Sequence, residues 1–278
     1  MTLRRVEFAL TRLFYLMKYL SVSFLLLLTL LLSAAEPRVV SLTPAITETI
    51  CFLGGEPALV GRSVACDFPA HIKKLPAAGD YTGYFLERLL KLKPDYVISN
   101  HFTARDKRLK KHISAKMVEL PVKTIEDYIH SLEVLGTILN RQETGREEAR
   151  KAALKLAELK QNAAKVKQKP VALWIIWHNP LLIAGPGSLP DTVMELAGLR
   201  NAAGNVNTEY FKASREWLIT QKVDFLIWTV NGVPFQRKGI WAKYREDQVI
   251  SNLNADILLR PGPRIFDGID QLQNALKK

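Results

Sequence analysis

Short β-rich runs alternate with helical patterns along this chain, and one long helical pattern divides them into two blocks. The β-rich runs cover residues 38–42, 59–63, 96–100 and 117–120 in the first block, and 171–177, 223–230 and 255–259 in the second. A closing helix is expected over 265–276. Because alternating strands and helices are typical of parallel α/β units, the sequence predicts an α/β protein with two parallel-sheet lobes.

The pattern between the two blocks is helical and rich in alanine. An amphipathic helix is expected over 124–139, and a capping box at Thr144–Glu147 predicts a second helix that runs to about Lys167 before Pro170. At 1.5 Å per residue such a helix spans roughly 30 Å, enough to join two lobes rigidly. The predicted organisation is an N-terminal lobe over 36–140, a connecting backbone helix over 141–169 and a C-terminal lobe over 170–278.

The two blocks share a weak internal repeat. Residues 87–98 align without gaps with residues 216–227, and Glu, Leu, Lys, Asp and Ile recur at the same offsets. The alternative explanation is coincidence between two ordinary helix-to-strand junctions. The gapless match favours two equivalent lobes.

The N-terminus has the three-part pattern of a secretory signal. Four basic residues precede the apolar run 19–32, and the small residues of 33–35 follow it, which predicts a signal peptide over 1–35 that is cleaved after Ala35. The alternative is a retained N-terminal membrane anchor, because the apolar run and its flanks approach a spanning length. No cysteine lies at the cleavage point, so a lipid anchor is not expected there. Cleavage leaves 35 basic and 26 acidic residues, a net charge of +9.

The net charge of +12 for the full chain raises the possibility of nucleic-acid binding. The basic residues, however, are interpreted as dispersed, and neither zinc-finger spacing nor an RNP-like aromatic segment is present. No nucleic-acid partner is therefore expected. A Gly-x-Ser-x-Gly elbow, a phosphate-binding loop and a His-Glu-x-x-His helix are also missing from the sequence, so no catalytic residues are predicted and the protein is not expected to be an enzyme. The alternative of another class is an exported α/β enzyme of unrecognised chemistry.

The chain has two cysteines, Cys51 and Cys66. Export to an oxidising compartment permits a disulfide, and the two residues are expected at the end of the first helix and after the next strand. The alternative is two buried thiols. The even count and the compartment favour a Cys51–Cys66 disulfide.

Several segments of the chain carry a family resemblance. They are 38–48, 60–63, 66–69, 86–95, 195–198 and 214–216, and together they extend through nearly the whole chain after the signal. The sequence resembles the periplasmic substrate-binding proteins of ABC importers for cobalamin and iron chelates, in which a long backbone helix joins two lobes, and it is most similar to the cobalamin-binding member. The resemblance implies a periplasmic, monomeric protein without a resident cofactor. It would deliver a corrinoid, or alternatively haem or a ferric siderophore, to the membrane permease.

The resemblance also implies two docking glutamates. Glu87 and Glu216 match the residues that engage arginines on the permease, one from each lobe. Both are expected in the first turn of a short helix, where a carboxylate suits the helix dipole, with Ser214 as an N-cap. The alternative explanation is that glutamate is common in the first turn of any helix, because of the same helix dipole.

Ligand-binding residues are expected in loops at the carboxyl ends of the strands, where open α/β sheets place their ligands. The predicted residues are Thr43, Pro44, Ala65, Tyr81, Asn100, Trp177, His178, Leu182, Tyr210 and Asn231. In the cobalamin-binding relative, the positions of Ala65, Tyr81, Asn100, Leu182 and Tyr210 are mostly aromatic. Only the two tyrosines keep that character here.

Two histidines and several basic residues are further candidates. His101 and His178 are either hydrogen-bonding residues or ligands to the metal of a chelate, with Tyr81 or Tyr84 as a phenolate ligand. No bare-metal site is expected, because no cluster has zinc spacing. Candidates to receive an anionic group are Arg62, Arg237, Lys238 and Arg260.

Overall fold

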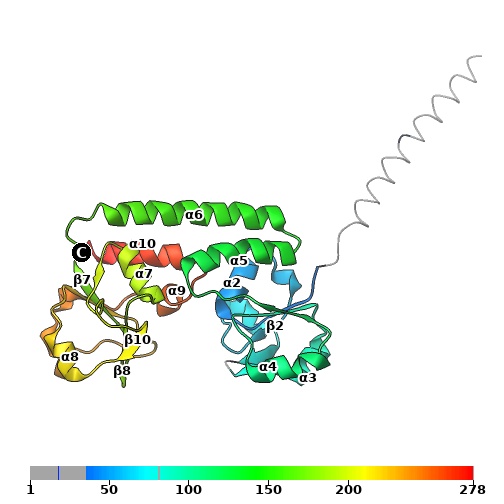
Figure 1. The fold of residues 1–278 in the computed structure, drawn as a ribbon, viewed down its shortest axis with the longest axis horizontal. Helices are drawn as coiled ribbons and strands as arrows, with labels where there is room; N and C mark the ends of the chain where they lie inside the picture. The colour runs from blue at the N-terminus through cyan, green and yellow to red at the C-terminus, as the bar shows by residue number, and fades with distance from the viewer. Residues whose placement is uncertain (1–17, 19–35, 81, 278) are drawn as a thin grey trace, which may run out of the picture. The chain divides into compact units, whose positions relative to one another are not determined.

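The first block of the chain forms a lobe around a six-stranded sheet, called lobe 1 (Figure 1). The computed structural model describes residue 18 and residues 36–80 and 82–277, so the predicted signal peptide, apart from Lys18, and Tyr81 lie outside the described residues. The strand order is β4 (Gly83–Tyr84), β3 (Ala77–Asp80), β2 (Leu59–Ser63), β1 (Val39–Ser41), β5 (Tyr96–Ser99) and β6 (Lys116–Glu119). Every neighbouring pair is parallel except β3 and β4.

Helices connect these strands. The α-helices of lobe 1 are α2 (Pro44–Phe52), α3 (Leu86–Leu92), α4 (Ala104–Leu109) and α5 (Ile125–Ile138), and the short 3-10 helices are η1 (Glu56–Ala58), η2 (Ala70–Lys74) and η3 (Lys110–His112). Thr124 caps α5 by accepting a hydrogen bond from the Asp127 backbone N–H at 3.0 Å. Pro44 is the first residue of α2. Proline is favoured at this position, because the N–H group that it lacks would have no hydrogen-bond partner within the helix.

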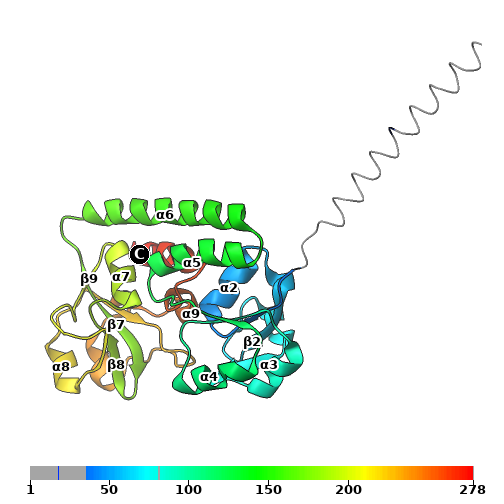
Figure 2. The same cartoon turned by 45° about the vertical axis from the view of Figure 1, so that its right-hand side comes forward.

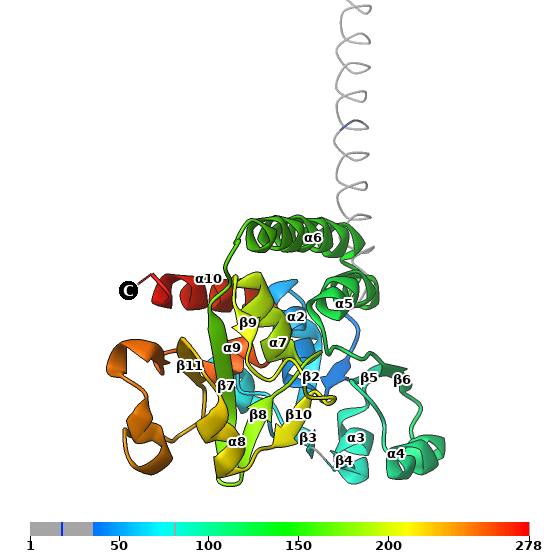
Figure 3. The ribbon, with the colours of Figure 1, turned by 60° about the vertical axis from the view of Figure 1, so that its left-hand side comes forward.

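The second block forms lobe 2 around another six-stranded sheet. Its order is β10 (Tyr210–Lys212), β8 (Leu181–Ala184), β7 (Val171–His178), β11 (Phe225–Trp228) and β12 (Val249–Ile250), and β9 (Arg200–Asn201) also pairs with β7. The helices of this lobe are α7 (Leu189–Leu196), α8 (Arg215–Thr220), α9 (Ala255–Leu258), α10 (Ile265–Ala275), η4 (Gly239–Lys243) and η5 (Glu246–Gln248). Figure 3 shows α8 at the end of lobe 2 away from the long helix α6.

The helix α6 (Gln142–Ala164) runs from lobe 1 to lobe 2 along α5 and past α10 (Figures 1 and 2). Its buried stripe includes Leu156 and Leu159, and these join one core cluster that extends from Val39 in lobe 1 to Trp174 and Ile269 in lobe 2. Both lobes belong to one compact unit, Pro37–Lys278. The predicted fold of two α/β lobes with a long connecting helix is confirmed, but the sheet of lobe 2 is mixed rather than parallel, because β8 pairs antiparallel with both β7 and β10. Among the described residues, the helices lack the length and apolarity needed to cross a membrane.

Two local predictions are wrong. The run 255–259 is helical in α9 rather than a strand, because Asn254 Oδ1 accepts a hydrogen bond from the Asp256 backbone N–H at 2.9 Å and starts a helix there. The capping box at Thr144–Glu147 is also missing. The Gly145 N–H already donates to the Arg141 carbonyl oxygen at 2.9 Å, so Thr144 lies inside α6.

The predicted disulfide is absent, because Cys51 and Cys66 are both free thiols. Cys66 Sγ accepts a hydrogen bond from Thr47 Oγ1 at 3.0 Å, one helical turn before Cys51 in α2, and this polar contact takes the place of the S–S bond. Burial, with a smaller contribution from the charge of Glu56, raises the pKa of Cys51 to about 12 and keeps its thiol protonated. The alternative of two buried thiols is observed in part, since Cys66 is buried and Cys51 is partly buried.

A close contact between glycines sets the position of α6 on α5. A Cβ atom at Gly145 would lie 2.6 Å from the Leu132 carbonyl oxygen and 3.0 Å from Gly136 Cα. Backbone atoms cannot yield to a methyl group as flexible side chains do, so we expect Gly145→Ala to reduce the free energy of unfolding by about 2 kcal/mol. Urea denaturation would measure this. Thr144→Ala, at the neighbouring exposed position, should stay within about 0.5 kcal/mol of wild type. Equal effects of the two variants would contradict the close packing.

Candidate functional site

A cavity of about 480 Å³ lies between the two lobes. Thr43 and Pro44 at the start of α2 and Asn100 after β5 line it from lobe 1, and Tyr210 at the start of β10 lines it from lobe 2. The Asn100 backbone N–H donates to Thr43 Oγ1 at 3.1 Å, which holds the two lobe 1 loops together. The structure thus brings four of the predicted ligand residues into one cleft, at the carboxyl ends of β1 and β5 as expected for an open parallel sheet.

A smaller cavity of about 180 Å³ adjoins the cleft in lobe 1 and shares Thr43, Pro44 and Asn100 with it. Ala65 and His101 also line this smaller cavity. Asn100 Oδ1 is buried there and has no hydrogen-bond partner. A buried amide oxygen without a partner costs free energy, and Asn100 is a lining residue of both cavities.

Three further predicted residues gather on the β7–β8 hairpin of lobe 2. Trp177 pairs with Leu182 across the hairpin, and the Trp177 ring is 5.7 Å from the His178 ring, between centroids. His178 Nδ1 is buried without a partner, with the Trp228 ring 5.9 Å from the imidazole. These residues do not line the two cleft cavities. Asn231 lies apart in an exposed turn after β11.

The structure excludes one proposed metal ligand. Tyr84 is fully buried and its hydroxyl donates to the Asp106 carbonyl oxygen at 2.7 Å. Burial, and secondarily the charge of Asp106, raises the Tyr84 pKa to about 12, so the phenolate predicted as an alternative does not form near neutral pH. Across residue 18 and residues 36–80 and 82–277, no group of three or more His, Cys, Asp and Glu side chains is arranged to hold a metal ion.

Two of the basic candidates are occupied by the protein itself. The Arg62 guanidinium donates to the carbonyl oxygens of Ser63, Ile72 and Lys73 at 2.8, 3.1 and 2.9 Å. Arg260, although it lines the cleft, is held by ion pairs within the protein. Neither guanidinium is left to receive an anionic ligand. Arg237 and Lys238 lie exposed before η4.

An ion cluster that the sequence interpretation missed ties the lobes together beside the cleft, which its member Arg260 lines. Glu48 of α2, whose side chain is 3% exposed, contacts Arg264 at 2.8 Å and Arg260 at 3.2 Å. Arg260 also contacts Asp67 at 2.7 Å and Asp256 at 3.1 Å. In the contacts between lobes, the two partners are 193 to 216 residues apart in the sequence. The cluster could therefore not be predicted from residue spacing.

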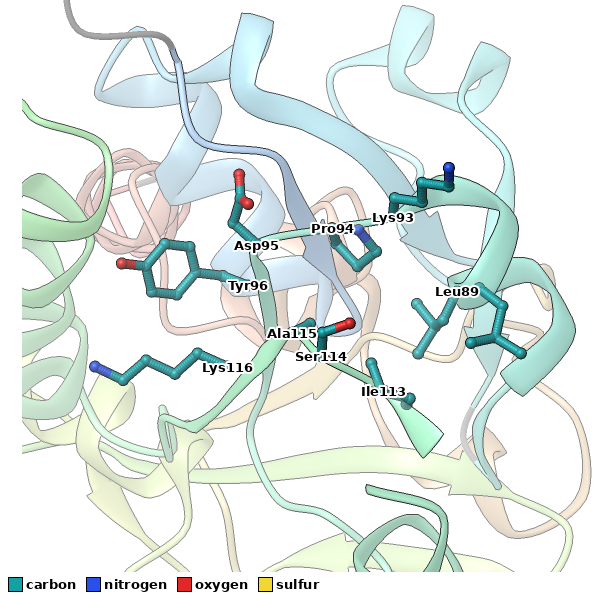
Figure 4. Close-up of a pocket in the computed structure, with 10 residues that line it drawn as sticks. Leu89, Lys93, Pro94, Asp95, Tyr96, Ile113, Ser114, Ala115 and Lys116 are labelled. Carbon is teal, nitrogen blue, oxygen red and sulfur yellow. The ribbon is translucent and has the colours of Figure 1, made fainter. Parts of the chain in front are cut away.

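Another lobe 1 cavity, of about 570 Å³, lies outside the cleft (Figure 4). Lys93, Asp95, Tyr96 and Lys116 line it at the amino ends of β5 and β6. Asp95 Oδ2 accepts a hydrogen bond from the Arg38 backbone N–H at 2.8 Å, which is a structural role. Because open α/β sheets bind ligands at the carboxyl ends of their strands, this cavity is not assigned to the ligand.

The internal repeat is structural. Glu87 and Glu216 are each the second residue of a short helix, α3 and α8, and both side chains are exposed. Each helix leads into the strand beside the first strand of its lobe. Asp224 Oδ2 accepts from the Val171 N–H at 2.7 Å, as Asp95 does from Arg38 in lobe 1. The two glutamates therefore occupy equivalent places in two equivalent lobes.

Local bonds keep Glu216 ionised. Ser214 caps α8 as predicted, since its Oγ accepts from the Trp217 backbone N–H at 3.0 Å. Hydrogen bonds from its own backbone N–H and from Ser214 lower the pKa of Glu216. In Figures 1 and 2, α3 and α8 lie on the side of the two lobes away from α6. The molecule thus presents one exposed carboxylate from each lobe on that side.

Comparison with known proteins agrees with this architecture. Residues 39–255 match the family described as "Periplasmic binding protein". The vitamin B12-binding protein of Salmonella typhi is 29% identical over 247 residues, covering 88% of this chain and 91% of that protein. The vitamin B12-binding protein of Vibrio vulnificus strain YJ016 is 28% identical over 267 residues, covering 92% and 96%.

Solved structures share the fold. The periplasmic vitamin B12-binding protein BtuF of Vibrio cholerae superimposes with a TM-score of 0.74 at 24% identity, covering 87% of this chain and 97% of that one. A periplasmic haem-binding protein of Pseudomonas aeruginosa gives a TM-score of 0.73 at 24% identity, covering 87% and 92%. Since the family match covers most of the sequence and both lobes are present, the chain belongs to the periplasmic binding protein family.

Proposed function

We propose that this protein captures a corrinoid in the cleft between its lobes and delivers it to the permease of an ABC importer. The observation that carries the proposal is the cavity lined by Thr43, Pro44 and Asn100 from one lobe and Tyr210 from the other. Relatives named for vitamin B12 binding support the ligand class. The protein acts as a binding protein rather than an enzyme, and the signal over 1–35 directs its export to the periplasm and is then cleaved.

The chemistry of the cleft favours a corrinoid over haem or a carboxylate siderophore. A corrinoid carries peripheral amide groups, and their N–H groups match the unpartnered buried oxygen of Asn100. The propionates of haem would instead require a cation. Of the two cationic side chains that line the cleft, Arg260 already contacts three carboxylates, which leaves only Lys123 to receive a propionate. Haem remains the alternative ligand, because solved haem-binding proteins share the fold.

We expect calorimetric titration of the purified protein to give saturable one-to-one binding with cyanocobalamin. Titrations with haemin and with a ferric siderophore should give at least about ten-fold weaker binding. Tyr210→Ala should weaken cobalamin binding about ten-fold, because a partly exposed aromatic ring at the cleft supplies contact area.

Tyr210→Phe serves as the matched control, since it keeps the ring and removes only the hydroxyl. Its affinity should stay within about two-fold of wild type. If haemin bound more tightly than cyanocobalamin, haem rather than a corrinoid would be the ligand. Failure of all three compounds to bind would refute the metal-chelate class.

A further inference from the structure

One exposed segment of lobe 1 is strongly basic. It consists of α4 and η3, and we call its five cations the basic patch: Arg105, Lys107, Arg108, Lys110 and Lys111. All five side chains are exposed, as is the neighbouring His112. The dispersal of basic residues that was expected from the sequence is therefore wrong for this segment.

The acidic residue within the segment does not neutralise the patch. Asp106 is buried, and its carboxylate accepts hydrogen bonds from the backbone N–H and hydroxyl of Thr103. Within the described part of the chain, the only ion pair of the patch joins Lys107 to Glu119, at 3.9 Å. A helix C-terminus favours cations, which accounts for Lys107 and Arg108 but not for the two lysines that follow the helix.

The basic patch lies next to the docking glutamate of lobe 1. A hollow of about 720 Å³ is lined by Glu87 and Arg88 of α3 and by Arg105 and Arg108 of α4. Arg88 donates to the Ala77 carbonyl oxygen and is thereby engaged by the protein. Figures 1 and 2 show α3 and α4 together on the side of lobe 1 away from α6. The patch is thus on the side that would approach the permease.

Lobe 2 also has exposed cations on and beside α8, at Lys212, Arg215 and Lys222, but they are spread along the chain rather than gathered in one run. The Lys243 ammonium group donates to the carbonyl oxygens of Leu218 and Ile219 at 2.8 and 3.1 Å, and burial lowers its pKa. Arg245 is paired with Asp247 at 2.9 Å. The densest run of exposed cations on the docking side therefore belongs to lobe 1.

We propose that the basic patch binds anionic phospholipid headgroups at the surface of the membrane that holds the permease. The inference rests on the proposed function, because docking through Glu87 is what brings this side of lobe 1 to the membrane. Each Lys or Arg near an anionic bilayer strengthens binding about five-fold, and salt screens the attraction within roughly 10 Å. Clustered, exposed cations, of which only Lys107 has an ion pair among the described residues, suit such a surface, which presents many phosphates without fixed geometry.

The test measures sedimentation of the protein with vesicles of phosphatidylcholine, with and without phosphatidylglycerol, in the absence of ligand and permease. The patch variant carries the substitutions Arg105→Gln, Arg108→Gln, Lys110→Gln and Lys111→Gln. We expect wild type to bind only the anionic vesicles, and the patch variant, which lacks four cations, to bind them about 600-fold more weakly. High salt should abolish the difference.

A control variant removes the same charge near the ends of α6 and α10, with Lys165→Gln, Lys167→Gln, Lys169→Gln and Lys277→Gln. It should bind anionic vesicles within about two-fold of wild type. Circular dichroism would verify that both variants are folded. Equal vesicle binding by the patch variant and the control would overturn the proposal.

Two other outcomes would also overturn it. Binding to duplex DNA without binding to anionic vesicles would assign the patch to nucleic acid. Loss of ligand uptake in the patch variant, with vesicle binding unchanged from wild type, would assign it to an acidic surface of the permease. Because the vesicles contain no permease, a failure to bind them would not affect the proposed docking role of Glu87 and Glu216. Conversely, normal uptake by the Glu87/Glu216 variant would not change the result of the vesicle experiment.

Discussion

Cells that express Glu87→Arg/Glu216→Arg as their only copy of this protein should lose ligand uptake by about 1,000-fold at limiting ligand concentration. Each reversal removes a carboxylate and places a cation against the arginines that the permease is proposed to present. Losing one partner of an interfacial charge pair costs about 2 to 5 kcal/mol, and the two sites lie on separate lobes, so their effects should add. Uptake of radiolabelled cobalamin would measure the loss.

Ligand affinity should not change in this variant, because neither glutamate lines the cleft between the lobes. The calorimetric dissociation constant is therefore expected within about two-fold of wild type. Glu133→Arg/Glu158→Arg, at exposed positions of α5 and α6, provides a control with the same change of charge, and it should retain uptake. Normal uptake by the Glu87/Glu216 variant would disprove the docking role.

The largest stability effect is expected at Glu48. Its Oε1 and Oε2 accept hydrogen bonds from Arg264 at 2.8 Å each, and Oε1 accepts another from Arg260 at 3.2 Å. Glu48→Gln leaves two mostly buried guanidinium groups without this carboxylate. We expect the free energy of unfolding to fall by about 3 kcal/mol, as measured by urea denaturation.

An exposed ion pair supplies the control for this prediction. Glu143 contacts Arg146 at 2.8 Å on α6, with side chains 87% and 67% exposed, so Glu143→Gln should cost less than about 0.5 kcal/mol. A loss below about 1 kcal/mol for Glu48→Gln would show that the ion cluster does not hold the lobes.

The same cluster predicts a direction of pH dependence. A hydrogen bond from Arg260 lowers the pKa of Asp67 in the folded protein. A carboxylate with a lowered folded pKa stabilises the protein above its unfolded pKa, and that contribution disappears as pH falls through the folded value. The stability supplied by Asp67 should therefore decline below about pH 4.

Predictions from sequence succeeded where the pattern was local. The apolar runs over 38–42 and 96–100 became β1 and β5, because buried parallel strands need continuous apolar residues. The repeat that contains Glu87 and Glu216 correctly predicted two equivalent helix starts. A helix turn and the strand that follows it are also specified by residues close together in the sequence. The run 255–259 failed because its apolar residues fit either structure, and the Asn254 cap decided for a helix.

The candidate site was predictable only in part. Thr43 and Asn100, which line the cleft, were predicted because each follows a strand. The loops at the carboxyl ends of the strands are where open parallel sheets bind their ligands. Trp177 and His178 are the last two residues of β7, yet neither lines the two cleft cavities. The partners of Arg260 were not predictable, since no pattern marks which carboxylates a distant arginine will meet.

The sequence by itself determined two equivalent α/β lobes, the long helix between them and the matching glutamates, because these depend on residues within a few positions of one another. Only the tertiary structure decided that Cys51 and Cys66 are not bonded to each other, that Arg260 serves the protein rather than a ligand, and that the cations of α4 lie beside Glu87. Each of these depends on groups brought together from separate segments. Their energies act only once the chain has folded, which is why no local pattern records them.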